Sequence, residues 1–543
     1  MRAAVVSGRY LPREPIRIRA EKSKGLCRHL VLPHPLDALV LQLLTNEAVR
    51  VLRTAQPSRN AFFEPQASRI STVNDSPDDY QSQRAWLNFQ QEILNFANHY
   101  PYLVVTDIAN YYDYVSLAQL RQIISHWART KEPIIDFILF VLDFYTWKPD
   151  YMLSSLRGLP QMEYDAPRLF AHAYLYDLDS FMERRFAGRY ARFMDDIDVG
   201  CSSRVEAKQV IRDMDEILKT REVRLNSGKT LILTSAEALR YFMANENIVA
   251  NRLQAELENA IATGVPAQRA TRFLQHLMHR FENRPDYLTW GQGAKMRKRS
   301  ISLWRSARIP LSQRLSENWL QNDPVTRGYV LQTLGWEGHA TWKLDLFVRF
   351  LREGWGIDDV SKFEVAQSII SMECPRTAIG RIQTVYSLLL RERSEVAFIS
   401  CLWLAAKFFR VDACWNLIER STDLWTSNDW IGRQVGALYT RFLTNQNYKN
   451  RFANLVRSSK NAGLNDLYGF YLAVEEGRYS ERAIGPYMFA SATSSSRGIA
   501  FERILFARIV LTGAYGQPFR MRLKQSLLAQ PLDYFERRLI APL

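Results

Sequence analysis

The spacing of apolar residues divides the chain into a mixed N-terminal part and a helical C-terminal part. Residues 36–44 and 86–96 carry apolar side chains at helical spacing, whereas residues 102–107 form a run of β-favouring residues. A second apolar and aromatic run, residues 189–198, predicts a strand, a turn and another strand. The pattern is then helical, with segments at 235–242, 253–261, 360–372, 382–391, 396–409, 431–443 and 501–511. We therefore expect an α+β fold followed by an all-α region.

These patterns predict three consecutive domains. Residues 1–235 form the mixed part, residues 236–310 a small helical unit, and residues 311–543 an all-α domain. The helices of the last part suit the stacked pairs of a HEAT-like helical repeat, although no repeat period is clear in the sequence. Residues 66–83 are rich in Ser, Asp and Pro and predict a loop.

Three aspartates stand where the predicted strands end. Asp107 closes the run 102–107, and Asp195 and Asp196 are adjacent in the second run. Adjacent carboxylates repel each other, so a turn that carries both is best explained by divalent cations, which prefer oxygen ligands. Three carboxylates from two segments are the minimum for two Mg²⁺ ions about 3.5–4 Å apart, an arrangement suited to phosphoryl transfer. Asp198 is expected to be a surface charge.

Composition adds a polyanionic partner to this picture. The 543 residues contain 71 Lys and Arg against 56 Asp and Glu, a formal net charge of +15. This balance favours nucleic acid or nucleotides as partners, although a soluble basic protein without such a partner has the same charge. The five cysteines form no CxxC pair, which favours a reducing cytoplasm over a disulfide framework or zinc site. No segment has the ~18 apolar residues of a membrane span, and no apolar leader is visible.

Four short motifs resemble, in the same order, motifs A to D of reverse transcriptases. They are Asp107 with Tyr111 and Tyr112, Gly158-Leu-Pro-Gln161, Phe193-Met-Asp-Asp196, and Leu225-Asn-Ser-Gly-Lys-Thr230. Together they cover roughly residues 100–235. The chain resembles most the prokaryotic abortive-infection and defence-associated reverse transcriptases, in which a helical region follows the polymerase core. The resemblance implies a right-hand polymerase with fingers and palm in 1–235, a thumb-like region in 236–310 and the helical domain after it.

The resemblance also implies catalytic roles. Asp107, Asp195 and Asp196 are expected to hold two Mg²⁺ ions, for which Mn²⁺ is the alternative. Lys229 is expected to assist the leaving pyrophosphate, because a cation there offsets the charge that develops in the transition state. An exposed turn lysine is the ordinary alternative for Lys229.

Four further residues are candidates for nucleotide contacts. Tyr112 occupies the position whose ring excludes a ribose 2′-OH, and Gln161 is expected to shape the nucleotide and template site. Lys22 and Arg59, with Lys24 and Arg28 nearby in sequence, are candidates to contact the triphosphate. The ordinary alternatives are a packed ring for Tyr112 and exposed surface charges for the basic residues.

Two positions depart from the family pattern. Met162 follows Gln161 where template-copying relatives carry a small residue, and a bulky side chain there argues against close approach of a template strand. Phe193 replaces a tyrosine before the Asp pair and keeps the ring, so activity is expected to survive. These departures favour synthesis with an unusual template or none. Copying of a dedicated non-coding RNA is the alternative.

A basic run near the end of the thumb-like region is a candidate nucleic-acid surface. Its members crowd around Trp304 and are Lys295, Arg297, Lys298, Arg299, Arg305 and Arg308. Basic charge beside an aromatic ring suits a strand's phosphates and a stacked base. A solvated helix face is the equal alternative.

Priming requires a hydroxyl, and members of the resembled family can use a protein tyrosine. Tyr515, between Gly513 and Gly516, is expected to lie on a mobile exposed loop, and Tyr10 is the second candidate. An ordinary surface tyrosine is the alternative for each. His339 is the last histidine, so the C-terminal region cannot carry the Arg–His motif of a HEPN ribonuclease.

The sequence thus predicts a bacterial, cytoplasmic, Mg²⁺-dependent DNA polymerase of antiphage defence. Its expected partners are dNTPs, the DNA product, a non-coding RNA and further copies of the chain, which meet through the helical domain. A nucleic-acid-binding protein with a vestigial polymerase fold is a third hypothesis. The intact Asp107, Asp195, Asp196 and Lys229 argue against it.

Overall fold

The computed structural model describes residues 2–63, 82–148, 151–152, 155–162, 164–284, 286–489 and 500–543. The chain forms two compact units, the first made of residues 1–17, 29–249 and 288–296, the second of 18–28, 250–287 and 297–543. The units therefore interleave along the sequence, and the division into three consecutive domains stays a prediction. Residues 64–81, which hold most of the predicted loop, lie outside the described part.

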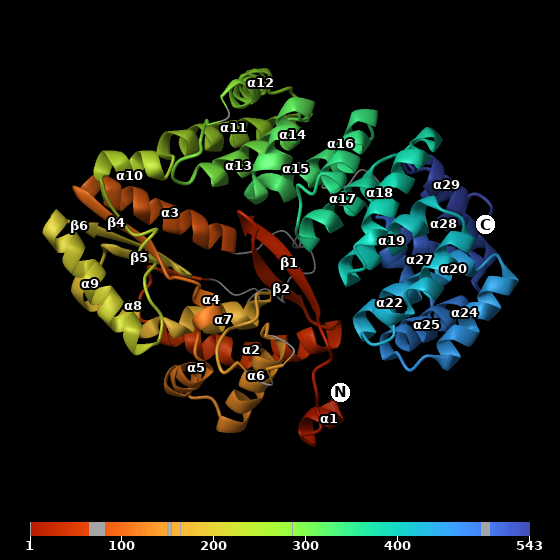
Figure 1. Ribbon diagram of the computed structural model, residues 1–543, viewed down its shortest axis with the longest axis horizontal. Coiled ribbons are helices and arrows are strands. Elements are labelled where there is room, and N and C mark those ends of the chain that lie inside the picture. Colours follow the sequence, from red (N-terminus) through yellow and green to blue (C-terminus); the bar gives the residue numbers. More distant parts are fainter. Residues whose placement is uncertain are drawn as a thin grey trace. The chain divides into compact units, whose positions relative to one another are not determined.

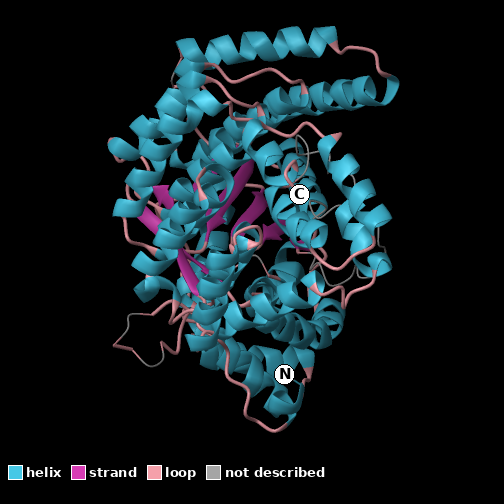
Figure 2. Ribbon diagram, turned by 90° about the vertical axis from the view of Figure 1, so that its right-hand side faces the viewer, coloured by secondary structure: helices cyan, strands magenta, loops and turns pink. Residues whose placement is uncertain are grey.

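Strands are few and helices many (Figure 2), and the fold is α+β as predicted. A two-stranded sheet pairs β1 (Ile16–Ser23) with β2 (Leu26–Leu32). The other sheet has the order β3-β5-β6-β4-β7, with bounds β3 (Ala61–Phe62), β4 (Tyr102–Asp107), β5 (Tyr190–Phe193), β6 (Asp196–Cys201) and β7 (Leu231–Thr234). The observed bounds of β4 are those predicted for the run 102–107.

Helices of the first unit account for most of its residues. They are α1 (Arg2–Val6), α2 (Pro35–Ala55), α3 (Ser82–His99), α4 (Tyr111–Tyr114), α5 (Leu117–Ile123), the π-helix η2 (Ile124–Ala128), α6 (Glu132–Tyr145), α7 (Asp165–Tyr174), α8 (Tyr176–Phe186), α9 (Arg204–Thr220) and α10 (Ser235–Tyr241). Sequence explains several starts. Pro35 stands in the first turn of α2, and Thr234 with Glu237 forms a capping box at α10.

The five-stranded sheet is covered on both faces because its side chains alternate. Val104 and Val199 point to the large core on the side of α8 and α9, whereas Leu103 and Val105 join a second core with α3 and α10. Figure 1 shows α3 on one side of the sheet and α8 and α9 on the other. The end of β4 and the start of β6 are thereby fixed from both sides.

The remaining helices build the second unit. Two cross its boundary, α11 (Ala244–Thr263) and α13 (Gly293–Ser306). The others are α12 (Gln268–Asn283), α14 (Gln313–Asn322), α15 (Pro324–Trp336), α16 (Thr341–Arg352), α17 (Asp359–Ser371), the 3₁₀-helix η3 (Arg376–Ala378), α18 (Ile379–Arg391), α19 (Glu395–Phe408), α20 (Val411–Arg420), α21 (Thr422–Trp425), α22 (Asp429–Ala437), α23 (Tyr439–Phe442), α24 (Gln446–Ser458), α25 (Ala462–Glu475), α26 (Glu481–Phe489), α27 (Phe501–Thr512), α28 (Gln517–Leu528) and α29 (Tyr534–Ile540).

These helices stack in two layers. In one layer α15 packs on α17, α17 on α19, α19 on α22, α22 on α25 and α25 on α27, while α14 packs on α16 and α16 on α18 in the other. Each helix thus contacts the second or third helix after it in sequence, which is the order of contacts expected for stacked helices. The helix predicted over residues 431–443 is two, α22 and α23. Gly436 weakens helical continuity there and lets the side chain of Leu467 approach.

The helix starts of one layer are regularly spaced. The N-cap residues of α15, α17, α19, α22 and α25 are 35, 36, 34 and 33 positions apart, and each side chain accepts a backbone N–H of its own helix. These residues are Asp323, Asp358, Ser394, Asn428 and Asn461. The pattern of apolar residues does not reveal this spacing, because these helices share a polar N-cap residue and not a fixed apolar pattern.

Candidate active site

Strand register brings the predicted carboxylates to one end of the sheet. Asp107 in β4 and Asp196 in β6 are direct cross-strand partners. The Cβ atoms of such partners lie about 4.5–5.5 Å apart. Phe193 also pairs with Asp196, which leaves Met194 and Asp195 as a two-residue turn between β5 and β6. Met194 has φ of 56°, the left-handed conformation that tight hairpin turns use. Three carboxylates from two strands are therefore neighbours.

Lys229 lies against the same carboxylates. Its Nζ donates to Oδ2 of Asp107 and forms an ion pair with it. The segment that carries Lys229 is held by the backbone, because Asn226 N–H donates to the carbonyl of Asp107 over 2.8 Å. Lys229 and Asp107, which are 122 residues apart in sequence, are thus brought together by backbone contacts at the end of β4.

The three carboxylates repel one another, and this repulsion affects their pKa values. Burial raises the pKa of Asp195 to about 6, and the charges of Asp196 and Asp107 add to the effect. Burial also raises the pKa of Asp196, against the lowering influence of Lys295 and Lys229. Oδ1 of Asp107 is buried and has no hydrogen-bond partner. The site therefore holds more negative charge than its lysines offset.

This donor set fits a divalent cation. Among the described residues, no group of three or more histidine, cysteine or carboxylate side chains stands ready to hold a metal ion. The donor chemistry nevertheless fits Mg²⁺, because the donors are all carboxylate oxygens, one of them is a buried atom without a hydrogen-bond partner, and their mutual repulsion would be relieved by a counter-charge.

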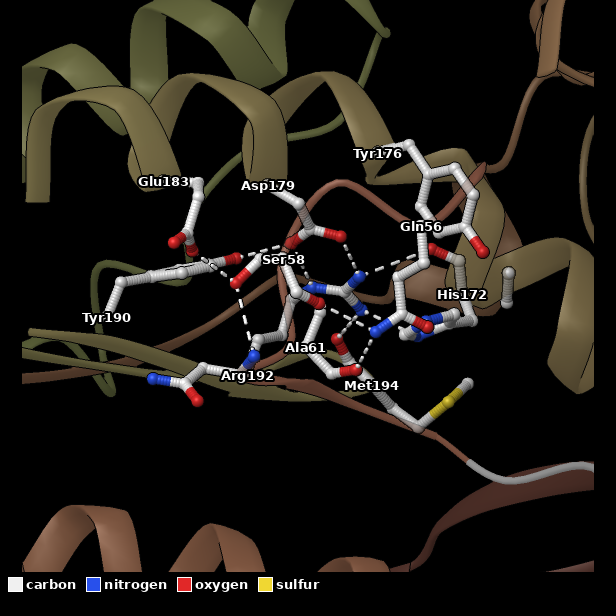
Figure 3. Close-up of polar contacts among 12 residues, drawn as sticks. Gln56, Ser58, Ala61, His172, Tyr176, Asp179, Glu183, Tyr190, Arg192 and Met194 are labelled. Carbon is white, nitrogen blue, oxygen red and sulfur yellow. Dashed lines mark hydrogen bonds and ion pairs between the residues drawn. The ribbon is translucent and has the colours of Figure 1, made fainter. Parts of the chain in front are cut away.

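A buried network holds the carbonyl of Met194, the residue before Asp195 (Figure 3). Arg192 in β5 is fully buried; its Nε donates to Asp179 over 2.8 Å and its Nη1 donates to the carbonyl of Met194 over 2.9 Å. Asp179 also accepts the hydroxyl of Tyr190 over 2.7 Å. Burial and the charge of Arg192 lower the pKa of His172 well below its ordinary value, so this neighbour stays neutral. Arg192 therefore connects the core to the turn of Met194 and Asp195.

Sequence reasoning passed over Arg192 and Asp179. A usable signal was present, because Arg192 stands between Ala191 and Phe193 in a strand that is otherwise apolar and aromatic. A charged residue at such a position needs a buried partner.

The segment around Gly158 is fitted against α4. Gly158 has φ of 96°, and a Cβ there would meet Cγ2 of Thr146 at 2.9 Å. The N–H of Leu159 donates to the carbonyl of Tyr112 over 2.7 Å, and Nε2 of Gln161 donates to Oδ1 of Asp113 over 3.4 Å. Tyr112 and Gln161, two of the predicted nucleotide-contacting residues, are thus linked through hydrogen bonds between α4 and the segment after Gly158.

Comparison with protein-family models agrees with this geometry. Residues 40–275 match the model described as reverse transcriptase (RNA-dependent DNA polymerase). The chain contains a reverse transcriptase domain. Its enzyme class is therefore RNA-directed DNA polymerase, as the sequence predicted. Comparison with curated proteins finds no match.

The match covers the mixed part from residue 40 onward and the first helices after it. It contains the aspartates, Gly158, Gln161 and Lys229, and it ends within α12. In the described part of the chain, no helix is long and apolar enough to cross a membrane.

Two neighbouring tyrosines of the reverse transcriptase domain differ in burial. Tyr111 is 2 % exposed and its hydroxyl donates to the carbonyl of Ala171, so it is a packing residue. Tyr112 is half-buried at the edge of the same core. The contact of Tyr112 with a sugar stays a prediction.

The side chain of Met162 points into the core. Its side chain is 8 % exposed and belongs to the hydrophobic core of the first unit. The expectation that Met162 obstructs a template strand is therefore wrong. The residue points inward because the segment after Gln161 leads directly into the buried helix α7.

Asp198 is not the surface charge expected. It is 2 % exposed, and one of its carboxylate oxygens has no hydrogen-bond partner. The alternation along β6 puts Asp198 on the same face as Asp196, under the cover of α3 and α10. Burial raises the pKa of Asp198 well above its ordinary value.

The basic run is divided between the two units. Lys295 belongs to the first unit: its Nζ lies 3.9 Å from Oδ2 of Asp196 and 3.8 Å from the ring centroid of Trp86. Arg297 belongs to the second unit and pairs with Asp323 over 2.7 Å. Sequence reasoning found Lys295 but not its place beside Asp196.

The other members of the run lie in the second unit. Arg299 donates to Oδ1 of Asn251, and burial lowers the pKa of Lys298. Trp304 cannot stack on a base, because it is fully buried and its indole N–H donates to the carbonyl of Leu274 over 2.9 Å. That expectation is wrong. Trp304 packs on Trp319 and Phe281 between helices.

Neither priming candidate is a free surface tyrosine. Tyr515 is 7 % exposed and packs on Phe519, so the expected exposed loop is absent at this residue; the turn folds down because Ala514 N–H donates to the carbonyl of Glu475. Tyr10 is half-buried, and its hydroxyl donates to Oδ1 of Asp37 over 2.5 Å. Burial raises the pKa of Tyr10.

The two triphosphate candidates are both exposed. Arg59 lies in the turn between α2 and β3 of the first unit. Lys22 lies in β1, within the part of that strand that belongs to the second unit. Their contacts with the triphosphate stay predictions.

Proposed function

We propose that this chain is a Mg²⁺-dependent DNA polymerase of bacterial antiphage defence. A primer hydroxyl attacks the α-phosphate of a deoxynucleoside triphosphate, a phosphodiester bond forms and pyrophosphate leaves. The observation that carries the proposal is the register of Asp107 opposite Asp196, with Asp195 in the adjoining turn and Lys229 on Asp107.

The residues of the site divide the work. Asp107, Asp195 and Asp196 would hold the two Mg²⁺ ions, which supply charge neutralisation and activation of the attacking hydroxyl when bound. Lys229 lies close enough to this cluster to place its charge on the leaving pyrophosphate. Tyr112 excludes a 2′-OH, and Gln161, held by Asp113, orients the base.

The primer in this proposal is a tyrosine of the chain itself. Tyr10 is the better candidate, because its side chain is only half-buried. The burial of Tyr515 speaks against it. Synthesis without an external template remains part of the proposal. It now rests on the resemblance to defence-associated reverse transcriptases alone.

Copying of a dedicated non-coding RNA is a second candidate function. The burial of Met162 supports it, because the residue that argued against a template strand lies in the core. The stacked helices would hold this RNA or join copies of the chain, as a HEAT-like repeat does with its extended surfaces.

One experiment tests these alternatives together. Purified protein is incubated with Mg²⁺ and each labelled dNTP separately, without template or primer, and run on a denaturing gel before and after protease and nuclease. Label that stays with the protein supports protein priming. Incorporation that requires added cellular RNA supports copying of an RNA. The Asp195→Ala, Asp196→Ala double variant is the control; equal incorporation or phage protection by it would overturn the proposed function.

The priming residue has its own test. Tyr10→Phe should abolish covalent labelling of the protein, whereas Tyr515→Phe should retain it. Peptide mapping of labelled wild-type protein identifies the attached residue independently, and label on any other residue would reject Tyr10.

A further inference from the structure

A cavity of about 650 Å³ lies in the helical unit, far along the sequence from the reverse transcriptase domain. Residues of η3, α18, α20 and α29 line it, and all of them belong to the second unit. Its volume is within the range of about 300–1,000 Å³ that small-ligand sites occupy. The match to the reverse transcriptase family ends at residue 275 and assigns nothing here.

The charged side chains around the cavity are mostly cationic. Arg376, Arg410 and Arg538 line it, with Asp412 as the one carboxylate among its lining residues. Asp412 is paired with Arg410 over 3.4 Å. Arg376 and Arg538 form no ion pair within the described part of the chain. Two guanidinium groups are therefore available to an anion.

The start of α20 adds to the positive potential. Arg410 is the N-cap of this ten-residue helix, and no side chain caps its free N–H groups. Arg410, Asp412 and Ala413 all line the cavity. The positive end of the helix thus lies at the same place as the guanidinium groups.

Two further arginines are buried behind the wall of the cavity. Arg441 is 4 % exposed and donates to the carbonyl of Phe409, which lines the cavity, while its Nε has no hydrogen-bond partner. Arg508 is 5 % exposed and donates to the carbonyls of Thr440 and Leu539. Burial lowers the pKa of Arg441 and lowers that of Arg508 to about 9.

The lack of carboxylates at Arg441 and Arg508 is specific to this place. Elsewhere in the same unit, buried Arg327 pairs with Glu21 over 2.8 Å, and buried Lys407 pairs with Glu536 over 2.8 Å. A buried charge without a counter-charge costs several kcal/mol. An anion bound in front of these groups would reduce that cost.

Aromatic rings complete the wall. Tyr386 is half-buried and meets Phe409 edge to face at 4.9 Å, and Tyr534 is 42 % exposed. Arginines beside accessible rings recognise phosphate and base together. We propose that this cavity binds a nucleoside phosphate, with its phosphate on Arg376 and Arg538 and its base against Tyr386 or Tyr534. The nucleotide is either free or part of a single strand.

The test measures binding without Mg²⁺, so that it does not depend on polymerisation. AMP and a fluorescent oligo(dT) of ten nucleotides are titrated in EDTA into the full chain carrying Asp195→Asn. The Arg376→Gln, Arg538→Gln double variant should weaken binding at least tenfold. The matched control is Arg391→Gln, Arg482→Gln, which removes the same charge from exposed positions outside the cavity and should bind as the parent does.

The outcomes separate the two sources of the nucleotide. Binding of AMP that depends on the two arginines indicates a free nucleotide, whereas such binding of oligo(dT) alone indicates a strand. Photocrosslinking of 4-thiothymidine-labelled oligo(dT) should place the crosslink on the peptides of Tyr386 or Tyr534 in the second case. Equal affinity of the cavity variant and the control variant, or no binding of either probe, overturns the proposal and leaves the polymerase function untouched.

Discussion

Arg192 of the five-stranded sheet and Arg441 of the helical unit are both buried, yet only Arg192 has a carboxylate partner. Arg192 is compensated by Asp179 and uses its remaining donors to fix the turn before Asp195. Arg441 donates to one carbonyl and leaves Nε unpaired. A compensated charge positions a neighbouring site, whereas an uncompensated one supplies potential to a ligand. The cluster of Asp107, Asp195 and Asp196 is the acidic counterpart of Arg441.

The largest effect is expected at Asp195. Asp195→Asn should lower nucleotide incorporation by about 10³-fold or more, ~4 kcal/mol of transition-state stabilisation, because a ligand of the reacting centre is lost. In EDTA the same variant should have a free energy of unfolding about 1 kcal/mol larger than that of wild type, because one of three repelling carboxylates is removed. It should therefore unfold at a higher denaturant concentration. Asp136→Asn, an exposed aspartate of the same unit, is the control for both measurements. Activity within tenfold of wild type would contradict the assignment.

Arg192→Met should be the most destabilising of the charge removals. It leaves Asp179 buried without its cation, which costs about 3 kcal/mol or more in the free energy of unfolding. Arg121→Met, which breaks an exposed pair with Glu132 and Asp136, should cost about 1 kcal/mol or less. Urea denaturation of both variants makes the comparison. Equal losses would mean that the network of Figure 3 has no special structural role.

Lys295→Gln should have a smaller, two-sided effect. The variant should incorporate nucleotides about tenfold more slowly at saturating Mg²⁺, because a cation beside Asp196 is lost. It should also need less Mg²⁺ for half its maximal rate, because Lys295 no longer competes for that carboxylate. Lys219→Gln on α9 is the control. An unchanged Mg²⁺ requirement would argue that Lys295 only packs on Trp86.

Local sequence was sufficient for the elements that carry the aspartates. The β-favouring run that ends in Asp107 and the Asp pair in a turn fix their own strand ends, so strand, turn and candidate metal ligands were predictable from residues 102–107 and 189–198.

Burial was not predictable in the same way. Met162, Asp198, Trp304 and Tyr515 were all assigned to the surface or to a ligand, and packing by helices distant in sequence buries each of them. The cavity of the helical unit escaped for the same reason, because Arg376, Arg410 and Arg538 come from three separate helical segments.

The smallest effect, and the one of opposite sign, is expected at Arg441. Arg441→Met keeps the apolar stem and removes an uncompensated charge, so the variant should be as stable as wild type or about 1 kcal/mol more stable. Arg327→Met, at an arginine that is equally buried but paired with Glu21 and Asp358, should instead lose about 3 kcal/mol. Urea denaturation in phosphate-free buffer gives both values. If the two variants lost the same stability, the hydrogen bond from Arg441 to the carbonyl of Phe409 would be sufficient compensation, and the positive charge behind the cavity would need no anion to explain it.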